Sequence, residues 1–260
     1  MVQYGLVCPG NYLKGMIPLA KSKVTTVEEA IKTYCFDGMS VLLPGFVNVG
    51  VPEVLIEGLL DAGIGDLSVI SNNTSVPGRG IGKLVRANTI KKITCSHIGN
   101  NSETVAKVVS GEINLTFVPQ GSLCEKVRAG GAGIGGVLTP TGLYTPMMEG
   151  KQVVEWDEQA GQYKFLEGEI VPDPSKKRFI LELPLHGDVC LVHAWKADKM
   201  GNVVYRRTSR NFNEVFATAA DHVIVEAEEI VEIGELGPDE IMTPGFVVDA
   251  VVQGRALTEA

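Results

Sequence analysis

Short apolar segments alternate with helix-forming segments along most of this 260-residue chain, and this alternation restricts the fold more than any other feature. Apolar runs bounded by glycine or proline indicate buried strands, and helices between such strands are typical of a parallel sheet. The expected strands lie at 40–43, 67–71, 93–97, 114–118 and 222–227. The expected helices lie at about 25–34, 52–63, 83–86, 103–111, 122–128 and 214–220, and Thr25 with Glu28 forms a capping-box pattern for the first. We therefore predict an α/β fold, an open and mainly parallel sheet with helices on both faces.

The pattern changes near residue 150. Residues 151–169 alternate apolar and polar side chains about a central glycine, as a solvated β-hairpin does. Longer strands are expected at 178–198 and 202–207. No proline- or serine-rich linker divides the halves, so 1–260 is interpreted as a single domain, with an N-terminal extension at 1–24 and a β-hairpin insertion at about 150–178.

Charge and cysteine usage exclude several classes of partner. The formal net charge is -8, which is a poor match for nucleic acid or for an anionic membrane surface. Five scattered cysteines form no C-x-x-C pair, which favours reduced thiols. The N-terminus has no signal-peptide pattern, and no apolar run approaches the roughly 20 residues that span a bilayer. These features predict a cytoplasmic protein that binds neither nucleic acid nor membrane.

The loop at 44–52 is the strongest local signal for a binding site. A predicted strand ends in Pro44-Gly45-Phe46, and Gly50 stands just before the helix that Pro52 begins. Exposed amides and the dipole at a helix N-terminus favour an anionic or carbonyl oxygen ligand. An ordinary tight turn between strand and helix explains the same spacing, so this pattern alone leaves both interpretations open.

The same segment resembles the signature of the class I coenzyme A transferases, which reads Asp-Gly, an apolar triplet, Gly-Gly-Phe, three residues and Gly-x-Pro. The matching positions are Asp37, Gly38, 41–43, Gly45, Phe46, Gly50 and Pro52. Pro44 departs from the family pattern because it replaces the first glycine of the pair. A proline has no backbone N–H to offer to coenzyme A (CoA), so a role of that amide is in doubt.

Two longer blocks carry the resemblance further. Residues 116–142 are similar to the family's Pro-Gln-Gly and Arg-Ala-Gly-Gly-Ala-Gly run, and residues 194–213 to the Trp-Lys-Ala-Asp and Arg-Asn-Phe-Asn segments of its alpha chains. Shorter matches are SNN at 71–73 and SGE at 110–112. The resemblance covers about 25–250. It points to the alpha subunit of a 3-oxoacid type enzyme, similar to the acetate/butyrate–acetoacetate and succinyl-CoA:3-oxoacid CoA-transferases.

The resemblance also implies which residues bind substrate and CoA. They are Gly45, Phe46, Gly50, Asn72, Asn73, His97, Gly99, Gln120, Gly121, Gly130, Gly131, Ala132 and Gly133. Gln120 would hold a carboxylate or thioester oxygen through its amide N–H; a turn residue that bonds its own backbone is the alternative. His97 and Asn100 stand where the 3-oxoacid enzymes usually have Tyr and Glu, so their effect on specificity is open.

Competing chemistries find less support. GAGIGG at 131–136 satisfies G-x-G-x-x-G, but it follows a predicted helix instead of a strand, so no dinucleotide site is expected. Cys124 is interpreted as a core residue and not as a nucleophile. No metal site is expected, because the four histidines lack metal-ligand spacing; His97 stands at a strand end that faces the site, and His186, His193 and His222 are interpreted as structural.

A cluster of arginines, Arg206, Arg207 and Arg210, has two readings. The three side chains either meet the phosphates of CoA or are solvated or interface arginines, and the second reading is the commoner one for surface arginines.

Transfer of CoA without hydrolysis is best served by covalent catalysis, in which a carboxylate attacks the acyl-CoA and then carries CoA as an enzyme-bound thioester. In the family the nucleophilic glutamate lies in a Ser-Glu-Asn-Gly motif of the beta subunit, and this chain contains no Glu-Asn-Gly. The resemblance therefore implies no catalytic nucleophile in this chain, an obligate beta-subunit partner in an α2β2 heterotetramer, and a CoA thioester as substrate without a permanently bound cofactor.

Several choices stay open from the sequence. The alternatives are a subunit of a CoA-thioester hydrolase and a non-enzymatic effector-binding module of related fold, since fold alone does not fix function. The acids of the reaction remain open among acetoacetate, butyrate, acetate, succinate and 3-oxoadipate.

Overall fold

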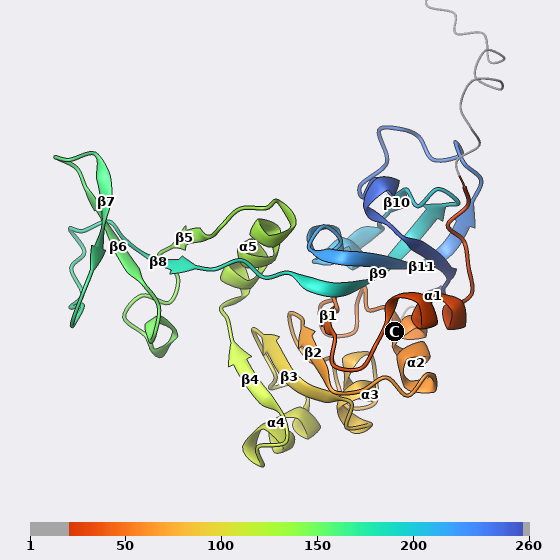
Figure 1. Cartoon of the computed structure of the whole chain (residues 1–260), viewed down its shortest axis with the longest axis horizontal. Helices are drawn as coiled ribbons and strands as arrows, with labels where there is room; N and C mark the ends of the chain where they lie inside the picture. The colour runs from red at the N-terminus through yellow and green to blue at the C-terminus, as the bar shows by residue number, and fades with distance from the viewer. Residues whose placement is uncertain (1–20, 257–260) are drawn as a thin grey trace, which may run out of the picture.

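The computed structural model describes residues 21–256, and an eight-stranded sheet forms the body of the molecule (Figure 1). The strand order is β12-β11-β9-β1-β2-β3-β4, with β10 paired to β9. Every pair is parallel except the antiparallel pair of β9 and β10. The strands are β1 (Ser40–Leu42), β2 (Leu67–Ile70), β3 (Ile90–Cys95), β4 (Asn114–Phe117), β9 (Gly187–Asp198), β10 (Val203–Val204), β11 (Ala220–Val231) and β12 (Ala250–Gln253).

Helices cover both faces of this sheet. The α-helices are α1 (Val27–Tyr34), α2 (Glu53–Asp61), α3 (Ile81–Arg86), α4 (Ser102–Val109), α5 (Gln120–Gly131) and α6 (Asn213–Phe216). Three 3₁₀ helices are also described, η1 (Pro146–Met148), η2 (Arg207–Arg210) and η3 (Gly245–Val247). Side chains of α1 to α4 belong to one apolar cluster, and side chains of α5 and α6 belong to the other. The predicted fold class, a mainly parallel α/β sheet covered on both faces, is confirmed.

The central strands are apolar on both sides because each face is buried. In β1, Val41 joins the cluster under α1 to α4, whereas Leu42 joins the cluster under α5 and α6. In β9, Leu191 and Val192 divide between the two clusters in the same way. Burial of each such side chain contributes about 1.5–3 kcal/mol, so this double burial fixes the register of the central strands.

The order of the strands reverses next to β1. From β1 the chain moves outward through β2, β3 and β4, and it then returns to the other side of β1 with β9, β11 and β12. Loops that follow adjacent parallel strands diverge at such a reversal and leave a crevice beyond the carboxyl ends. The junction of β1 and β9 is therefore where the fold predicts a binding site.

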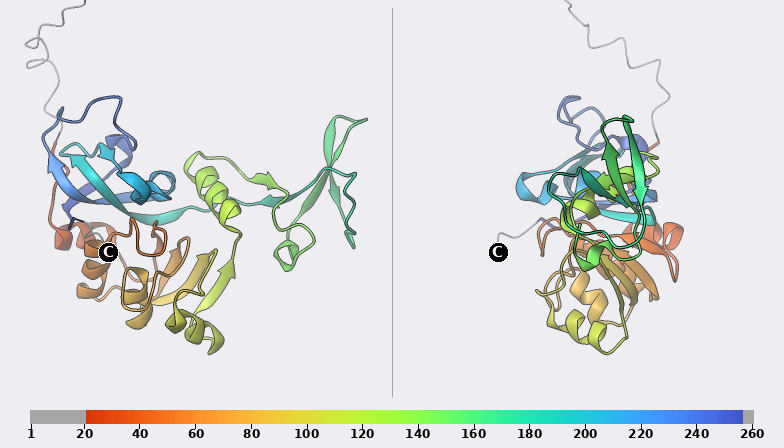
Figure 2. Two further views of the ribbon diagram at one scale, coloured as in Figure 1. Left: turned by 180° about the vertical axis from the view of Figure 1, so that it is seen from behind. Right: turned by 90° about the vertical axis from the view of Figure 1, so that its left-hand side faces the viewer.

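A second, antiparallel sheet projects from the body beside α5 (Figures 1 and 2). Its strand order is β5-β8-β6-β7, and its strands are β5 (Val137–Thr139), β6 (Val153–Asp157), β7 (Gln162–Leu166) and β8 (Arg178–Glu182). Strands β6 and β7 correspond to the hairpin expected within 150–178. The sheet extends beyond that range, because β8 pairs with both β6 and β5.

An ion-pair cluster connects the projecting sheet to the body. Glu182 on β8 is 1% exposed and accepts hydrogen bonds from Lys126 on α5 and from Lys151, which precedes β6. A buried carboxylate that pairs with two ammonium groups holds all three elements in one arrangement, because any displacement leaves a charge unpaired.

Some predicted boundaries differ from the observed ones. Thr26, and not Thr25, caps α1: its hydroxyl accepts the N–H of Glu29, which gives an equally good capping pattern one residue later. Helix α5 begins at Gln120 and not near residue 122, and β11 runs for 12 residues, far beyond the expected 222–227.

The N-terminal extension predicted at 1–24 falls mostly outside the described residues, which begin at 21. Its last residue, Val24, pairs with Val251 of β12. Within 21–256, every cysteine is a free thiol, and no helix is both long and apolar enough to cross a bilayer. Cys8 lies outside the described range.

Asp188 connects the first residues of β9 and β1 and should make stability depend on pH. Its Oδ2 accepts hydrogen bonds from the hydroxyl and the backbone N–H of Ser40, both at 2.6 Å. These bonds hold the pKa of Asp188 below its ordinary value. The stabilisation is therefore present above the ordinary carboxyl pKa of about 3.9, and it is lost as pH falls through the lower folded pKa.

We expect Asp188→Asn to lower the free energy of unfolding at pH 7 by about 1 kcal/mol. Urea unfolding over a pH series measures this difference, which should shrink below pH of about 4. A difference that stays constant down to pH of about 2 would contradict the role of the carboxylate.

Candidate functional site

The candidate site is a hollow of about 1000 Å³ at the carboxyl edge of the sheet, where the strand order reverses. Five segments that are distant in sequence line it: the loop at 47–51 after β1 with Glu53, residues within 78–83, residues 206–209 after β10, the β11 glutamates Glu226 and Glu228, and residues 255–256. The pairing of β9 with β1 ends at Cys190, but β9 continues to Asp198 and stays paired with β11 over this length. Strands β9 and β11 therefore extend past the end of β1. This difference in length leaves their polar residues beside the loop.

The loop after β1 is closed by a tight turn. Phe46 and Val49 exchange backbone hydrogen bonds of 2.9 and 3.0 Å. Val47, between them, adopts φ of 58°, a left-handed conformation that costs a β-branched residue about 1–3 kcal/mol. Phe46 is 50% exposed and Val49 is 41% exposed, whereas Gly45 and Gly50 at the two ends of the turn are buried. The turn therefore presents an aromatic ring to solvent next to Val47, which lines the hollow, although Phe46 itself is not among the lining residues.

Gly50 must be a glycine because the 209–213 segment touches it. It adopts φ of 70°, and a methyl group on its Cα would lie 2.5 Å from the carbonyl oxygen of Ser209. The same methyl would lie 2.8 Å from the side-chain amides of Asn211 and Asn213. Asn211 donates a hydrogen bond to Val49 O at 3.0 Å. The Asn-Phe-Asn segment thus holds the loop in place.

The side-chain amide of Asn213 makes hydrogen bonds through both its nitrogen and its oxygen. Its side chain is fully buried, and Nδ2 donates to the carbonyl oxygens of Gly50 and Ser209, both at 2.9 Å. Its Oδ1 accepts the backbone N–H of His193 at 2.9 Å. A buried amide with all these bonds made is stabilising, whereas each bond left unmade would cost about 1–3 kcal/mol.

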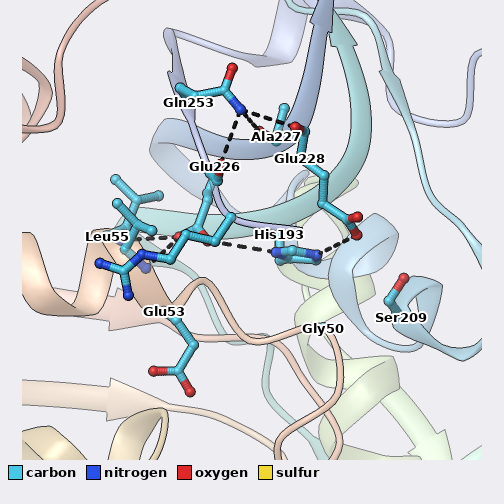
Figure 3. Close-up of polar contacts among 12 residues, drawn as sticks. Gly50, Glu53, Leu55, His193, Ser209, Glu226, Ala227, Glu228 and Gln253 are labelled. Carbon is cyan, nitrogen blue, oxygen red and sulfur yellow. Dashed lines mark hydrogen bonds and ion pairs between the residues drawn. The ribbon is translucent and has the colours of Figure 1, made fainter. Parts of the chain in front are cut away.

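The backbone amides at the start of α2 have acceptors within the chain, so of the two interpretations left open by the sequence the structure favours the ordinary tight turn. The backbone N–H groups of Val54 and Leu55 donate to Oε2 of Glu226, at 2.8 and 3.1 Å (Figure 3). The N–H of Glu53 donates to Val51 O at 3.0 Å. A carboxylate of the chain itself therefore occupies the position that one of the two interpretations gave to an external oxygen ligand.

His193 lies between two carboxylates behind this contact (Figure 3). Its Nε2 is 3.3 Å from Glu228 Oε1, and its Nδ1 is 3.8 Å from Glu226 Oε1 and makes no hydrogen bond. The ring is 1% exposed. His193 lies on β9, and its burial beside Glu226 and Glu228 of β11 agrees with the structural role expected for it.

Near the hollow, Arg206, Arg207 and Arg210 have partners within the chain. Arg206 pairs with Glu228 at 3.1 Å and lies over the Trp195 ring, and Arg210 pairs with Glu214 at 2.6 Å. These contacts favour the reading of solvated or structural arginines over phosphate ligands for Arg206 and Arg210. Arg207 lines the hollow.

A second group of polar side chains follows β2, β3 and β4 at the same edge. Asn72 Oδ1 accepts hydrogen bonds from Ser96 Oγ at 2.9 Å and from Gln120 Nε2 at 3.1 Å. Asn73 pairs with His97 as an isolated bridge between the two loops. Asn72 is buried and Gln120 is exposed, so the buried amide orients the exposed one. Gln120 is bonded to Asn72 and not to its own backbone.

His97 and Asn100 are exposed and bonded to each other, with 2.9 Å between Nε2 and Oδ1. Gly99 packs under the ring, since a methyl group there would lie 2.9 Å from His97 Cε1. Cys95, two residues before His97, is fully buried, and burial raises the pKa of its thiol to about 11. A thiol that stays protonated at neutral pH does not serve as a nucleophile here.

Helix α5 separates the predicted site residues into two groups. Gln120 and Gly121 form its first turn, whereas Gly130 and Gly131 end it and 132–133 follow. At about 1.5 Å per residue, the two ends lie roughly 15 Å apart. A methyl group at Gly130 would lie 1.9 Å from Leu185 O, so close packing against the segment before β9 explains that glycine. A role of 130–133 in CoA binding stays a prediction.

No group of three or more metal-ligating side chains occurs among residues 21–256. The site residues that sequence reasoning missed are Asn213 and Glu226. The Arg-Asn-Phe-Asn block stands out in the sequence as a family match, but nothing there marks it as a support of Gly50. Glu226 and Glu228 share one face of β11 and follow its apolar run Val223–Val225, and this was the available signal.

Comparison with known proteins places these features in a family. The model of the coenzyme A transferase family matches residues 24–254. The alpha subunit of acetate CoA-transferase from Escherichia coli (strain K12) is 41% identical over 232 residues, which are 89% of this chain and 97% of the relative. Mitochondrial succinyl-CoA:3-ketoacid coenzyme A transferase 2 of Homo sapiens is 40% identical over 219 residues, which are 84% of this chain but 42% of the relative.

The fold is shared with a solved structure. Glutaconate coenzyme A-transferase from Acidaminococcus fermentans superposes with a TM-score of 0.73 at 20% sequence identity, covering 90% of this chain and 76% of that chain. At this identity the likeness concerns the fold alone.

The buried amide of Asn213 gives a direct test of how the loop is held. In Asn213→Asp the side chain cannot donate, and its charge faces the Gly50 and Ser209 carbonyl oxygens. We expect the free energy of unfolding to fall by about 2–4 kcal/mol, measured by urea denaturation.

Asn114→Asp makes the same chemical change at an exposed position of β4 and should change stability by less than about 0.5 kcal/mol. Equal effects of the two substitutions would show that Asn213 does not hold the loop.

Proposed function

The chain belongs to the coenzyme A transferase family, and we propose that it is the alpha subunit of a heteromeric enzyme that moves CoA between a short acyl-CoA and a 3-oxo or other short carboxylic acid. The enzyme works in the cytoplasm as an α2β2 heterotetramer with a beta subunit. The CoA thioester is a substrate, and no cofactor is permanently bound.

The single observation that carries the proposal is how much of each relative's length aligns with this chain. The chain aligns with nearly all of a protein named as an alpha subunit, but with 42% of the human relative's length. The larger part of the human relative therefore has no counterpart here. Because this chain also has no Glu-Asn-Gly, the nucleophilic glutamate is assigned to the partner.

The chemistry divides accordingly. The partner's glutamate carboxylate attacks the thioester carbonyl, and the released CoA thiolate becomes attached to that glutamate as a thioester while the first acid leaves. The second acid then takes the CoA by the reverse sequence. Water must be excluded throughout, because hydrolysis of the thioester would release free CoA and no CoA would reach the second acid.

This chain supplies the wall of the pocket. The Phe46 ring, which the tight turn presents to solvent, would cover the thioester against water. Gln120 has one amide N–H bonded to Asn72. Its second N–H, for which the described residues show no partner, would hold the carboxylate or thioester oxygen. The other glycine and asparagine positions named from the family resemblance remain part of this proposed pocket.

Co-expression of the chain with a beta subunit that contains Ser-Glu-Asn-Gly tests the function. We expect transfer of CoA from acetoacetyl-CoA or succinyl-CoA to depend on an added acceptor acid, and neither chain alone to be active. Release of free CoA without an acceptor would instead identify a thioester hydrolase. An inactive complex that binds a small effector would favour the binding module.

Gln120→Ala tests the role of the amide within that complex. We expect kcat to fall about tenfold or more, because a hydrogen-bond donor to the reacting group is lost. Gln159→Ala removes an exposed glutamine in the hairpin turn and should leave kcat unchanged. Thermal unfolding should be the same for both variants, since Gln120 is exposed. An unchanged kcat for Gln120→Ala would contradict the proposal that Gln120 donates a hydrogen bond to the reacting group.

A further inference from the structure

Helix α2 begins without an acceptor of its own. Its N-cap is Pro52, which makes no side-chain hydrogen bond to the first turn. The first N–H groups of a helix need such an acceptor, because they have no partner within the helix. Glu226 of β11, 171 residues along the chain from Leu55, supplies it for Val54 and Leu55.

The Glu226 carboxylate is closely packed, although its side chain borders the hollow. It is 1% exposed, and His193 lies 3.8 Å from its other oxygen. Gly254 passes so close that a methyl group there would lie 2.5 Å from Glu226 Cγ. A carboxylate held in this way at a helix N-terminus also gains from the helix dipole. Its position therefore fixes where α2 begins.

The start of α2 controls two segments of the proposed pocket. One is the loop at 44–52, which leads directly into the helix and carries Phe46. The other is the loop after β2, because Glu53 accepts the N–H of Gly80 at 2.8 Å and pairs with Lys83. The second residue of that loop is Asn72, which orients Gln120.

We propose that Glu226 is a positioning residue for CoA transfer: by capping α2 from β11, it sets the places of Phe46 and of the Asn72–Gln120 pair. This inference rests on the proposed function. Glu226 acts through the helix and does not touch the reacting atoms. Its loss should therefore slow the chemical step more than it weakens substrate binding.

The experiment uses the two-chain complex and compares kcat with KM. We expect Glu226→Ala to lower kcat about tenfold or more while KM for acyl-CoA changes less than about threefold, because small displacements of positioned groups have large effects on rate. In Glu226→Gln the amide oxygen still accepts both backbone N–H groups, so kcat should stay within about threefold of the wild type. Glu229→Ala is the matched control: it lies on the same strand, 52% exposed and paired with Lys196, and should leave both constants unchanged.

Added formate gives a readout that a purely structural role would not move. In Glu226→Ala the amides of Val54 and Leu55 lose their acceptor, and formate can reach the vacated carboxylate position because Glu226 itself borders the hollow. We expect millimolar formate to restore part of the lost kcat in Glu226→Ala, and to have no such effect on the wild type or on Glu229→Ala.

A second variant keeps the inference testable should Glu226→Ala fail to assemble. Glu226→Asp retains the charge but withdraws the carboxylate by one methylene, so kcat should fall while the complex still forms. Wild-type kcat in either the Ala or the Asp variant overturns the positioning role. A wild-type complex without acceptor-dependent transfer overturns the proposed function itself, and this inference with it.

Discussion

The N-cap of α2 is a proline, whose side chain cannot accept hydrogen bonds from the first N–H groups of the helix. In this chain Glu226 accepts those of Val54 and Leu55 from β11, which lies on the other side of β1 from β2. The contact joins β11 to α2, and the fully bonded Asn213 joins the segment after β10 to Gly50. Together they hold the last residues of the loop after β1 and the helix that follows it. The strained turn at Val47 persists because its surroundings are fixed in this way.

The same edge of the sheet carries two groups with different tasks. The acidic group, Glu226 and Glu228 of β11, is bonded to other residues of the chain and supports the loop. The amide group of Asn72, Ser96 and Gln120 ends in an exposed side chain that can meet a ligand. One group of residues therefore holds the loop in place, and the other group leaves a side chain available for a ligand. For this reason the amides at the N-terminus of α2 already have acceptors within the chain, whereas Gln120 is exposed.

Local periodicity predicted the fold well, because buried parallel strands have a distinctive apolar pattern, and the loops at strand ends were predicted where they are observed. The role of Glu226 could not be predicted in this way, since its partners lie 171 and 172 residues away and only the folded sheet brings them together. Gly130 looked like part of a binding loop, but its place is explained by packing against Leu185. Glycine-rich sequence alone does not separate these two causes.

The central claim is that this chain forms the pocket while its partner carries the nucleophile. Treatment of the two-chain complex with acyl-CoA, followed by reduction with tritiated borohydride, tests it most directly, because borohydride reduces an enzyme-bound thioester and marks the residue that held it. The account predicts label on the glutamate of the partner's Ser-Glu-Asn-Gly motif and none on this chain. Label on a carboxylate of this chain would contradict it.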